Sequence, residues 1–243
     1  MSDGKGNVSS VPVCAPVHFL HVGKTGGTAL THALERTPVD WLHLHKHATR
    51  LADIPQGERV FFFLRDPVTR FISGFYSRKR RGSPRFDAVM SAAEEEAFAI
   101  FPTPGALAAA LSSRDAAVQA AATGAMRNIQ HVRDSYWYWL GSAEALWQRR
   151  EDILFIGQQE YLEADVAVLA RLLGLPIELP RDPVQAHVNP EGLDYSLSEE
   201  ARANLVAWSA GEYRAVEACV ELARSRGFGG SLQDAPPVPQ PSR

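Results

Sequence analysis

The chain has 243 residues, of which 45% are hydrophobic, and a formal net charge of −3 at pH 7. A chain of this length and apolar content can bury a sizeable core, and it is typical of a single domain. The small net charge gives no reason to expect a nucleic acid or an anionic membrane as a partner. Its two cysteines are too few to indicate a disulfide framework.

The two ends of the chain carry no pattern of a packed domain. The N-terminus lacks the apolar core of a signal peptide, and no apolar run approaches the length that spans a bilayer. We therefore expect a cytoplasmic protein, or one from which an N-terminal anchor was removed. Residues 1–12 are expected to be disordered and residues 13–230 to form one domain. Residues 231–243 contain four prolines and predict a disordered tail.

The first informative segment is residues 21–28, His-Val-Gly-Lys-Thr-Gly-Gly-Thr. It follows a short apolar run at 17–20 and precedes residues 29–34, whose apolar spacing predicts a helix. Such a turn can bind an anion, because glycine lets the backbone approach a ligand and the first N–H groups of a helix lack internal partners. Lys24 adds a full positive charge. The segment therefore predicts a site for a phosphate or sulfate group.

This segment does not fit the nucleotide-binding P-loop, Gly-x-x-x-x-Gly-Lys-Ser/Thr. With Lys24 as the loop lysine, that pattern needs a glycine at position 18, where the chain has histidine. The lysine also precedes the paired glycines. We therefore assign the anion site to residues 24–28, with Thr25 and Thr28 as hydroxyl donors. A tight strand-to-helix connection without a ligand is the alternative.

Three histidines follow at positions 43, 45 and 47. If this segment is extended, alternate side chains share a face and the three imidazoles point the same way. Histidine is poised to take a proton near neutral pH, so the segment predicts a general base. Two alternatives remain open. One is a metal site, for which no aspartate or cysteine stands at a supporting spacing; the other is a set of solvent-facing side chains with no chemical role.

A second motif begins with the continuous apolar run at 60–64, which predicts a strand buried on both faces. Asp66 and Pro67 suit the N-cap and first position of a helix, and apolar residues recur over 68–76 with the spacing of a stripe that packs on the sheet. Arg65 then lies at the carboxyl end of a strand, where open α/β sheets bind ligands, with Ser73 two helical turns on. Because guanidinium binds oxyanions through paired hydrogen bonds, Arg65 and Ser73 predict a second phosphate site.

Together, residues 19–28 and 62–76 resemble the sulfotransferases that use 3′-phosphoadenosine 5′-phosphosulfate. They are most similar to the carbohydrate branch that includes the heparan sulfate 2-O-sulfotransferases. The resemblance implies an α/β fold with a central parallel sheet flanked by helices. It implies that the first motif binds the 5′-phosphosulfate and the second the 3′-phosphate. The residues so assigned are Gly23, Lys24, Thr25, Gly26, Gly27 and Thr28 in the first motif, and Arg65 and Ser73 in the second.

The resemblance also implies the reaction, which is transfer of a sulfuryl group to a hydroxyl of a carbohydrate or another small molecule, without a metal. The related 2-O-sulfotransferases carry a His-x-His pair upstream of Arg-Asp-Pro, and residues 45–47 are similar to it. We favour His47 as the base, with His45 second, and Lys24 as the charge that neutralises the leaving phosphate. A nucleotide-dependent kinase and a non-catalytic nucleotide-binding module are the alternatives. The same motifs would occur in a monomer and in a homodimer.

The rest of the chain completes the predicted fold. Residues 86–150 read mainly as helices and are expected to form a helical insert that shapes the acceptor site. Strand and helix alternate again at 153–157 and 160–173, which supports a parallel sheet. Residues 196–226 predict a long helical region that starts after Ser198 and ends at Gly227.

Overall fold

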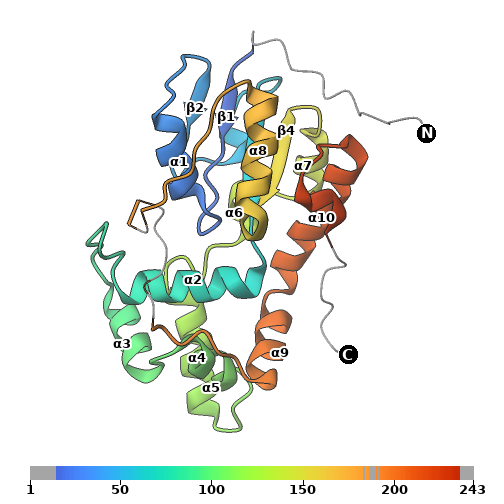
Figure 1. Cartoon of the computed structure of the whole chain (residues 1–243). Coiled ribbons are helices and arrows are strands. Elements are labelled where there is room, and N and C mark those ends of the chain that lie inside the picture. The colour runs from blue at the N-terminus through green and yellow to red at the C-terminus, as the bar shows by residue number, and fades with distance from the viewer. Residues whose placement is uncertain (1–14, 183, 186–189, 191, 236–243) are drawn as a thin grey trace, which may run out of the picture.

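A computed structural model describes residues 15–182, 184, 185, 190 and 192–235 of the chain. Its centre is a sheet of four parallel strands in the order β2-β1-β3-β4. The parallel sheet flanked by helices that the sequence predicts is confirmed (Figure 1). The strands are β1 (Val17–Phe19), β2 (Leu42–Leu44), β3 (Arg59–Leu64) and β4 (Ile153–Gln158).

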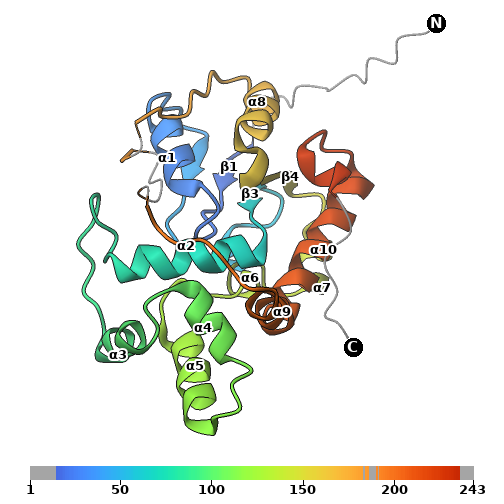
Figure 2. The ribbon, with the colours of Figure 1, turned by 60° about the horizontal axis from the view of Figure 1, so that its bottom comes forward.

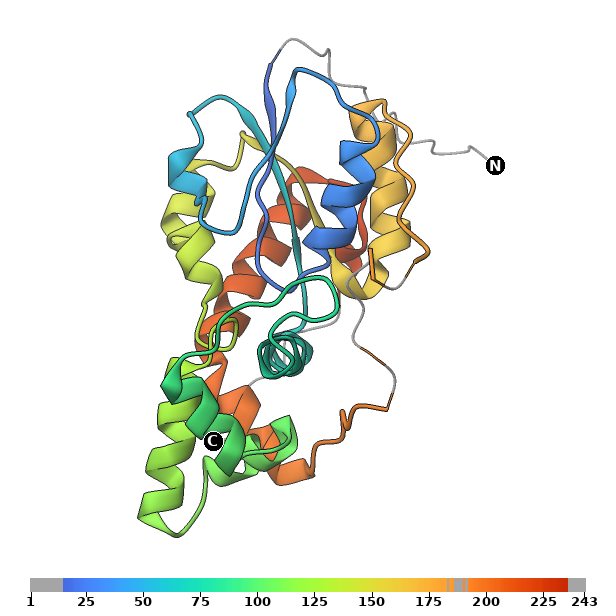
Figure 3. The ribbon, with the colours of Figure 1, turned by 90° about the vertical axis from the view of Figure 1, so that its left-hand side faces the viewer.

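Helices cover both faces of the sheet (Figure 3). Alternate side chains along β3 pack against the helices of opposite faces. Phe61 and Phe63 pack with the helices of one face, α1 (Gly27–Glu35) and α8 (Leu162–Leu173). Val60, Phe62 and Leu64 pack with the other face. That face is covered by α6 (Tyr136–Leu140), α7 (Ala143–Gln148) and α10 (Ala210–Arg226). Burial on both faces explains why β3 is a continuous apolar run.

A second core lies beyond the carboxyl ends of the strands, where α2 runs between the sheet and a group of helices (Figure 2). The apolar stripe of α2 packs against these helices, so the expectation that it packs on the sheet is wrong. Both sheet faces are already covered, and the stripe is buried by other helices instead. The helices of this second core are α2 (Pro67–Lys79), α3 (Ala92–Ile100), α4 (Pro104–Ala110), α5 (Ala116–Asn128) and α9 (Glu199–Trp208).

The segment expected to be one helical insert, residues 86–150, is divided between the second core and the sheet. Its helices α3 to α5 join the second core, whereas α6 and α7 return to the sheet. The loop between α5 and α6, residues 129–135, therefore runs from the second core back to the sheet, at the carboxyl ends of the strands.

The predicted helix ends agree with the structure where a cap was recognisable. Asp66 caps α2 by accepting a hydrogen bond from the Thr69 N–H at 2.9 Å, and Pro67 is the first helical residue. The helical region after Ser198 is broken at Ser209 into α9 and α10, and α10 ends at Gly227 with φ 64°. Left-handed backbone of this kind favours glycine.

The C-terminal boundary differs from the prediction. Ser231–Asp234 forms a 3-10 helix in which Leu232 is fully buried, and Ser231 donates hydrogen bonds from its N–H and Oγ to the Asp165 carboxylate. The segment belongs to the domain, so the predicted tail does not begin at residue 231. Burial of Leu232 and the hydrogen bonds to Asp165 keep these residues in the fold, although prolines follow them in the sequence. The remainder of that tail, 236–243, and the predicted disordered residues 1–12 lie outside the described part of the chain.

The strand order places a topological switch point between β1 and β3. From β1 the chain moves outward to β2, and it then returns to β3 on the other side of β1 before reaching β4. Crevices at such points are the usual ligand sites of open α/β sheets. The loops after β1 and β3, which carry the two predicted anion motifs, both start at this edge. Among the described residues, no helix is both long and apolar enough to cross a membrane.

The packing of β4 on β3 makes a stability prediction. A Cβ at Gly157 would lie 2.3 Å from the Phe63 ring, so Gly157→Ala should destabilise the fold by about 1–3 kcal/mol through overpacking. Gly124, inside α5, has open space at the same position, and Gly124→Ala should stabilise by about 0.5–1 kcal/mol. Urea unfolding measures both free energies, and equal effects of the two substitutions would contradict the packing described here.

Candidate functional site

The loop between β1 and α1 is shaped by two left-handed residues, Lys24 at φ 68° and Gly26 at φ 84°. Thr25 is buried, and its Oγ1 donates a hydrogen bond to the Val22 carbonyl at 2.9 Å. The Thr25 hydroxyl is therefore used inside the loop. The turn ends at the N-terminus of α1, where Gly26 offers no side-chain cap and the first N–H groups have no intrahelical partners. A positive helix dipole end thus lies beside Lys24.

Two glycines of the loop are required by close neighbours. A Cβ at Gly27 would lie 2.2 Å from the His21 ring, so only glycine lets the imidazole pack against the start of α1. A Cβ at Gly23 would lie 3.1 Å from Trp139. The two glycines therefore leave room for the loop to pass between the rings of His21 and Trp139.

The second motif is held by Tyr136 of α6. The Tyr136 hydroxyl accepts a hydrogen bond from the Arg65 N–H at 2.9 Å and donates one to the Arg65 carbonyl at 2.6 Å. The Arg65 side chain donates from Nε to Thr69 Oγ1 at 3.1 Å, and its Nη groups have no hydrogen-bond partner among the described residues. Arg65 thus ends β3 with its backbone fixed and the tip of its guanidinium available to a ligand.

Glu160, in the segment after β4, forms hydrogen bonds to the same motif. Its Oε1 accepts from the Asp66 N–H at 2.9 Å and from Thr69 Oγ1 at 3.1 Å. Its negative charge also supports the charged form of Arg65, whose pKa burial lowers from the ordinary value. These contacts assign Glu160 to holding the start of α2.

Arg70 connects the two motifs. Its side chain is buried, and Nε donates to the Gly23 carbonyl at 3.0 Å. Its guanidinium lies 4.6 Å from the ring centroid of Tyr136 and 5.3 Å from that of Trp139, and Nη1 pairs with Glu212 at 3.4 Å. One side chain therefore joins the loop after β1 to α2, α6 and α10.

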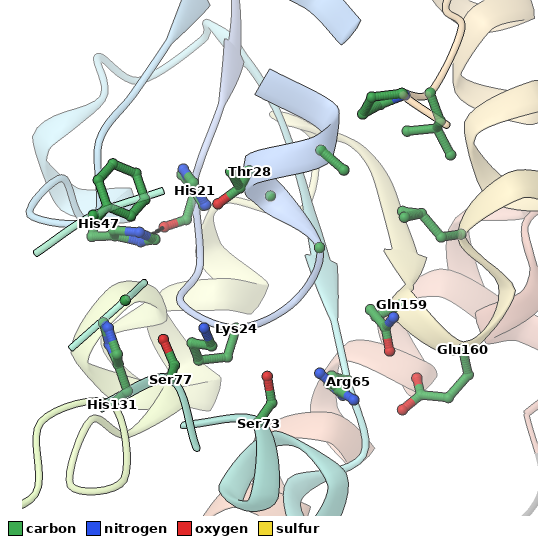
Figure 4. A pocket seen from close by; sticks show the side chains of 18 of the residues that line it. His21, Lys24, Thr28, His47, Arg65, Ser73, Ser77, His131, Gln159 and Glu160 are labelled. Atoms are coloured by element: carbon green, nitrogen blue, oxygen red, sulfur yellow. Dashed lines mark hydrogen bonds between the residues drawn. The ribbon is translucent and has the colours of Figure 1, made fainter. Parts of the chain in front are cut away.

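Both motifs line one cavity of about 960 Å³ (Figure 4). Lys24 lies in the middle, Ser73 and Arg65 lie to one side of it, and His47 and His131 lie to the other. The predicted residues on its wall are Lys24, Gly26, Gly27, Thr28, His47, Arg65 and Ser73. Gly23 and Thr25 support the loop from behind, through the contacts with Arg70 and Val22.

The cavity concentrates positive charge around Lys24. Burial, with the charges of Arg80, Arg65 and Arg70, lowers the pKa of Lys24 to about 7. Lys24 is therefore partly neutral at pH 7 in the free protein, and a bound anion would favour its protonated form. Uptake of a proton by Lys24 on binding of an anion is what this arrangement of charges favours.

The histidine segment does not present a single face, because β2 ends at Leu44 and a turn follows at 46–49. His45 lies away from the cavity and forms a hydrogen bond from Nε2 to His18 Nδ1 at 2.8 Å. His18 in turn contacts Glu58 at 2.5 Å. The turn sends His47 to the cavity wall instead. The expectation that the three histidines point one way is wrong, and the geometry separates His47 from His45.

His47 is oriented by a backbone carbonyl. Its Nδ1 lies 3.3 Å from the His21 carbonyl, which can only accept, so Nδ1 carries the proton and Nε2 keeps a free lone pair. Desolvation and the charge of His131 lower the pKa of His47 below its ordinary value. His47 is therefore neutral at pH 7, the form that can take a proton.

The cavity wall also contains residues to which the sequence assigned no role, namely His21, Ser77, His131 and Gln159. His21 and His47 lie with ring centroids 4.0 Å apart, and burial, with the charges of His47 and Lys24, lowers the pKa of His21 to about 3. His21 is the first residue of the 21–28 segment, and Ser77 lies one helical turn after Ser73 on α2, so both stand next to predicted site residues in the sequence. His131 comes from a distant loop, and no local pattern marks it. Within the described residues, no group of three or more metal-ligating side chains is arranged to hold an ion.

A scan of the sequence against protein-family models matches no family, and a search of curated proteins finds no match either.

The lowered pKa of Lys24 makes a prediction about anion binding. Sulfate does not change charge between pH 6 and 9, so its affinity should fall as the pH rises above about 7, where free Lys24 loses its proton. The decline should be absent in Lys24→Met, which binds weakly throughout, and preserved in Lys46→Met, which alters an exposed lysine. Titration followed by tryptophan fluorescence, with Trp139 against Gly23, measures the affinity. A wild-type affinity independent of pH would contradict the account.

Proposed function

We propose that this protein is a sulfotransferase that moves a sulfuryl group from 3′-phosphoadenosine 5′-phosphosulfate to a hydroxyl of a carbohydrate or another small molecule. The observation that carries the proposal is one cavity whose wall holds two separate cationic groups and a histidine with a lowered pKa. Lys24 and the start of α1 form one site, Arg65 and Ser73 form the other, and His47 shares the wall.

The two sites fit the donor better than they fit a nucleoside triphosphate. The phosphates of a triphosphate form one continuous chain, whereas the proposed donor carries a phosphosulfate on its 5′ oxygen and a phosphate on its 3′ oxygen. Two cationic sites on different strand ends suit two separated anionic groups. The position of Lys24 before the paired glycines also differs from that of the P-loop lysine.

The reaction needs positioning and charge stabilisation, by analogy with phosphoryl transfer. The acceptor oxygen attacks sulfur, and a new S–O bond forms while the bond from sulfur to the 5′-phosphate oxygen breaks. The electron pair of that bond goes to the phosphate oxygen, where the protonated Lys24 and the N–H groups of the loop stabilise the developing charge. Thr28 adds a hydroxyl donor on the same wall.

The proton of the acceptor hydroxyl goes to His47. Its Nδ1–H is fixed by the His21 carbonyl, so Nε2 accepts the proton. The lowered pKa keeps His47 unprotonated before the reaction. His45 is engaged with His18 away from the cavity, which favours His47 over His45 as the base.

Ligand-induced stabilisation and donor consumption test the proposal together. Adenosine 3′,5′-bisphosphate should raise the melting temperature, by several degrees at saturation, more than ATP with magnesium does. The labelled donor should also be converted to the bisphosphate. Stabilisation by ATP with magnesium alone would favour a kinase. Bisphosphate binding without donor consumption in any acceptor screen would favour a non-catalytic nucleotide-binding module; either result would contradict the proposal.

The 3′-phosphate assignment predicts a selective loss in Arg65→Ala. This variant should lose affinity for adenosine 3′,5′-bisphosphate by roughly tenfold or more, because a charge-assisted hydrogen bond contributes about 1.5–3 kcal/mol. Affinity for adenosine 5′-monophosphate should hardly change. Calorimetric titration measures both, and Arg36→Ala, at the exposed end of α1, is the matched control. Equal losses for the two nucleotides would place Arg65 outside the 3′-phosphate site.

The base assignment predicts a loss of turnover without a loss of binding. His47→Ala should lower kcat by ~10²–10⁴ and leave the bisphosphate affinity unchanged, whereas His45→Ala should have a much smaller effect. The wild-type rate should fall only below about pH 6.5, because the pKa of His47 lies under the ordinary histidine value. Steady-state rates across pH measure this. Activity that survives His47→Ala but not His45→Ala would reverse the assignment.

A further inference from the structure

His131 lies where two cavities meet. It lines the cavity of Lys24 and Arg65, and it also lines a second cavity of about 640 Å³ on the other side of the 129–135 loop. Its ring centroid lies 6.2 Å from that of His47, and Figure 4 shows the two rings on the same side of the first cavity. His131 therefore belongs to the walls of both cavities.

Three features hold His131 in this place. Its backbone is left-handed, with φ 67°, a conformation that is uncommon for residues other than glycine, although histidine, asparagine and aspartate adopt it more often than most. The Asp134 carboxylate accepts from the His131 N–H at 3.2 Å and lies 3.7 Å from Nδ1. Gly74 of α2 lets the loop approach, because a Cβ there would lie 3.0 Å from the His131 carbonyl oxygen. The left-handed backbone of His131 and the glycine at position 74 inside α2 each lower the stability of the fold. The surrounding contacts therefore keep His131 in a position that local backbone energies disfavour.

The two histidines offer the same chemical group from two sides. The Asp134 carboxylate lies 3.7 Å from Nδ1 of His131, where its negative charge favours a proton on that nitrogen, and the His21 carbonyl accepts from Nδ1 of His47 at 3.3 Å. Nε2 is then the acceptor nitrogen of each ring. Burial lowers the pKa of His131, and Lys24 and Arg78 lower it further, while Asp134 opposes them. Both rings are thus neutral acceptors at pH 7.

One hydroxyl has one proton and can donate to only one of these rings. Two hydroxyls on neighbouring carbons can donate one hydrogen bond to each ring. The second cavity is also lined by two partly exposed aromatic residues, Trp208 and Tyr138, the latter with Arg50 over its ring. Aromatic side chains of this kind can pack against a ring. Both features are expected for an acceptor that is a cyclic compound with adjacent hydroxyls.

We propose that His131 binds the acceptor, and that the protein therefore selects acceptors with vicinal hydroxyls. One hydroxyl gives its proton to His47 and attacks sulfur, while its neighbour donates a hydrogen bond to Nε2 of His131. The inference rests on the proposed sulfuryl transfer and names the substrate class of that same site. His131 is a specificity-determining residue in this arrangement, and Asp134 is a positioning residue that fixes its ring.

The test compares two probes that differ by one hydroxyl, trans-cyclohexane-1,2-diol and cyclohexanol, with labelled donor. The wild type should transfer to the diol with a kcat/KM about fivefold or more above that for cyclohexanol, the value of one hydrogen bond of about 1 kcal/mol. His131→Asn and His131→Gly, which both tolerate the left-handed backbone, should bring the ratio of the two kcat/KM values close to one. Asp134→Asn should give an intermediate ratio, and His32→Asn, on α1, should not change it.

Each outcome decides the inference separately from the proposed function. A preference for the diol that persists in both His131 variants would overturn it, as would a wild type that uses the two probes equally or uses neither. Donor hydrolysis by water, measured in the same samples without probe, reports sulfuryl transfer itself. If the donor is consumed and the preference does not depend on His131, the vicinal-hydroxyl inference fails while the proposed function stands. If the donor is consumed neither here nor with any compound of the acceptor screen, both fail.

Discussion

The buried guanidinium of Arg70 is the contact on which the rest of the site depends. It donates to the Gly23 carbonyl, pairs with Glu212 and lies over the rings of Tyr136 and Trp139. Removing one partner of a buried ion pair typically leaves an uncompensated charge and is strongly destabilising. Because Glu212 also accepts from the Ser135 hydroxyl and the Tyr136 N–H, the same carboxylate fixes the start of α6. The loop after β1 is thus tied to three helices from distant parts of the chain.

This arrangement explains how the two proposed anion sites come to share one cavity. Tyr136, held by its contact with Arg70, grips both the N–H and the carbonyl of Arg65 at the end of β3. The positions of Lys24 and Arg65 are therefore set by one network rather than by two independent loops. The same concentration of positive charge, in a partly desolvated cavity, lowers the pKa of Lys24 and makes an anion its natural partner. Structure and electrostatics support the same proposed ligand, a nucleotide with two separated anionic groups.

The sequence predicted the parts of the site that local patterns encode. The apolar run of β3, the Asp66 cap and Pro67 are contiguous, so the position of Arg65 at a strand end could be predicted correctly. Three features could not be predicted, because they depend on contacts between distant segments. Arg70 is paired with the Glu212 carboxylate, 142 residues away in the sequence. The helix α2 packs on other helices and not on the sheet. His131 reaches the cavity from a loop that carries no motif. The turn after β2 also brings His47, and not His45, to the cavity wall. The alternation of side chains along a strand did not indicate this difference.

A crystal structure of the protein with adenosine 3′,5′-bisphosphate tests the central claim most directly. The account predicts that the 5′-phosphate contacts the N–H groups of residues 24–28 and the Lys24 side chain, and that the 3′-phosphate contacts Arg65 and Ser73. The rings of His47 and His131 should then remain open beside the 5′ end, where the acceptor must enter. A nucleotide bound in the second cavity, one bound with its two phosphates exchanged, or none bound at saturating concentration would contradict the account.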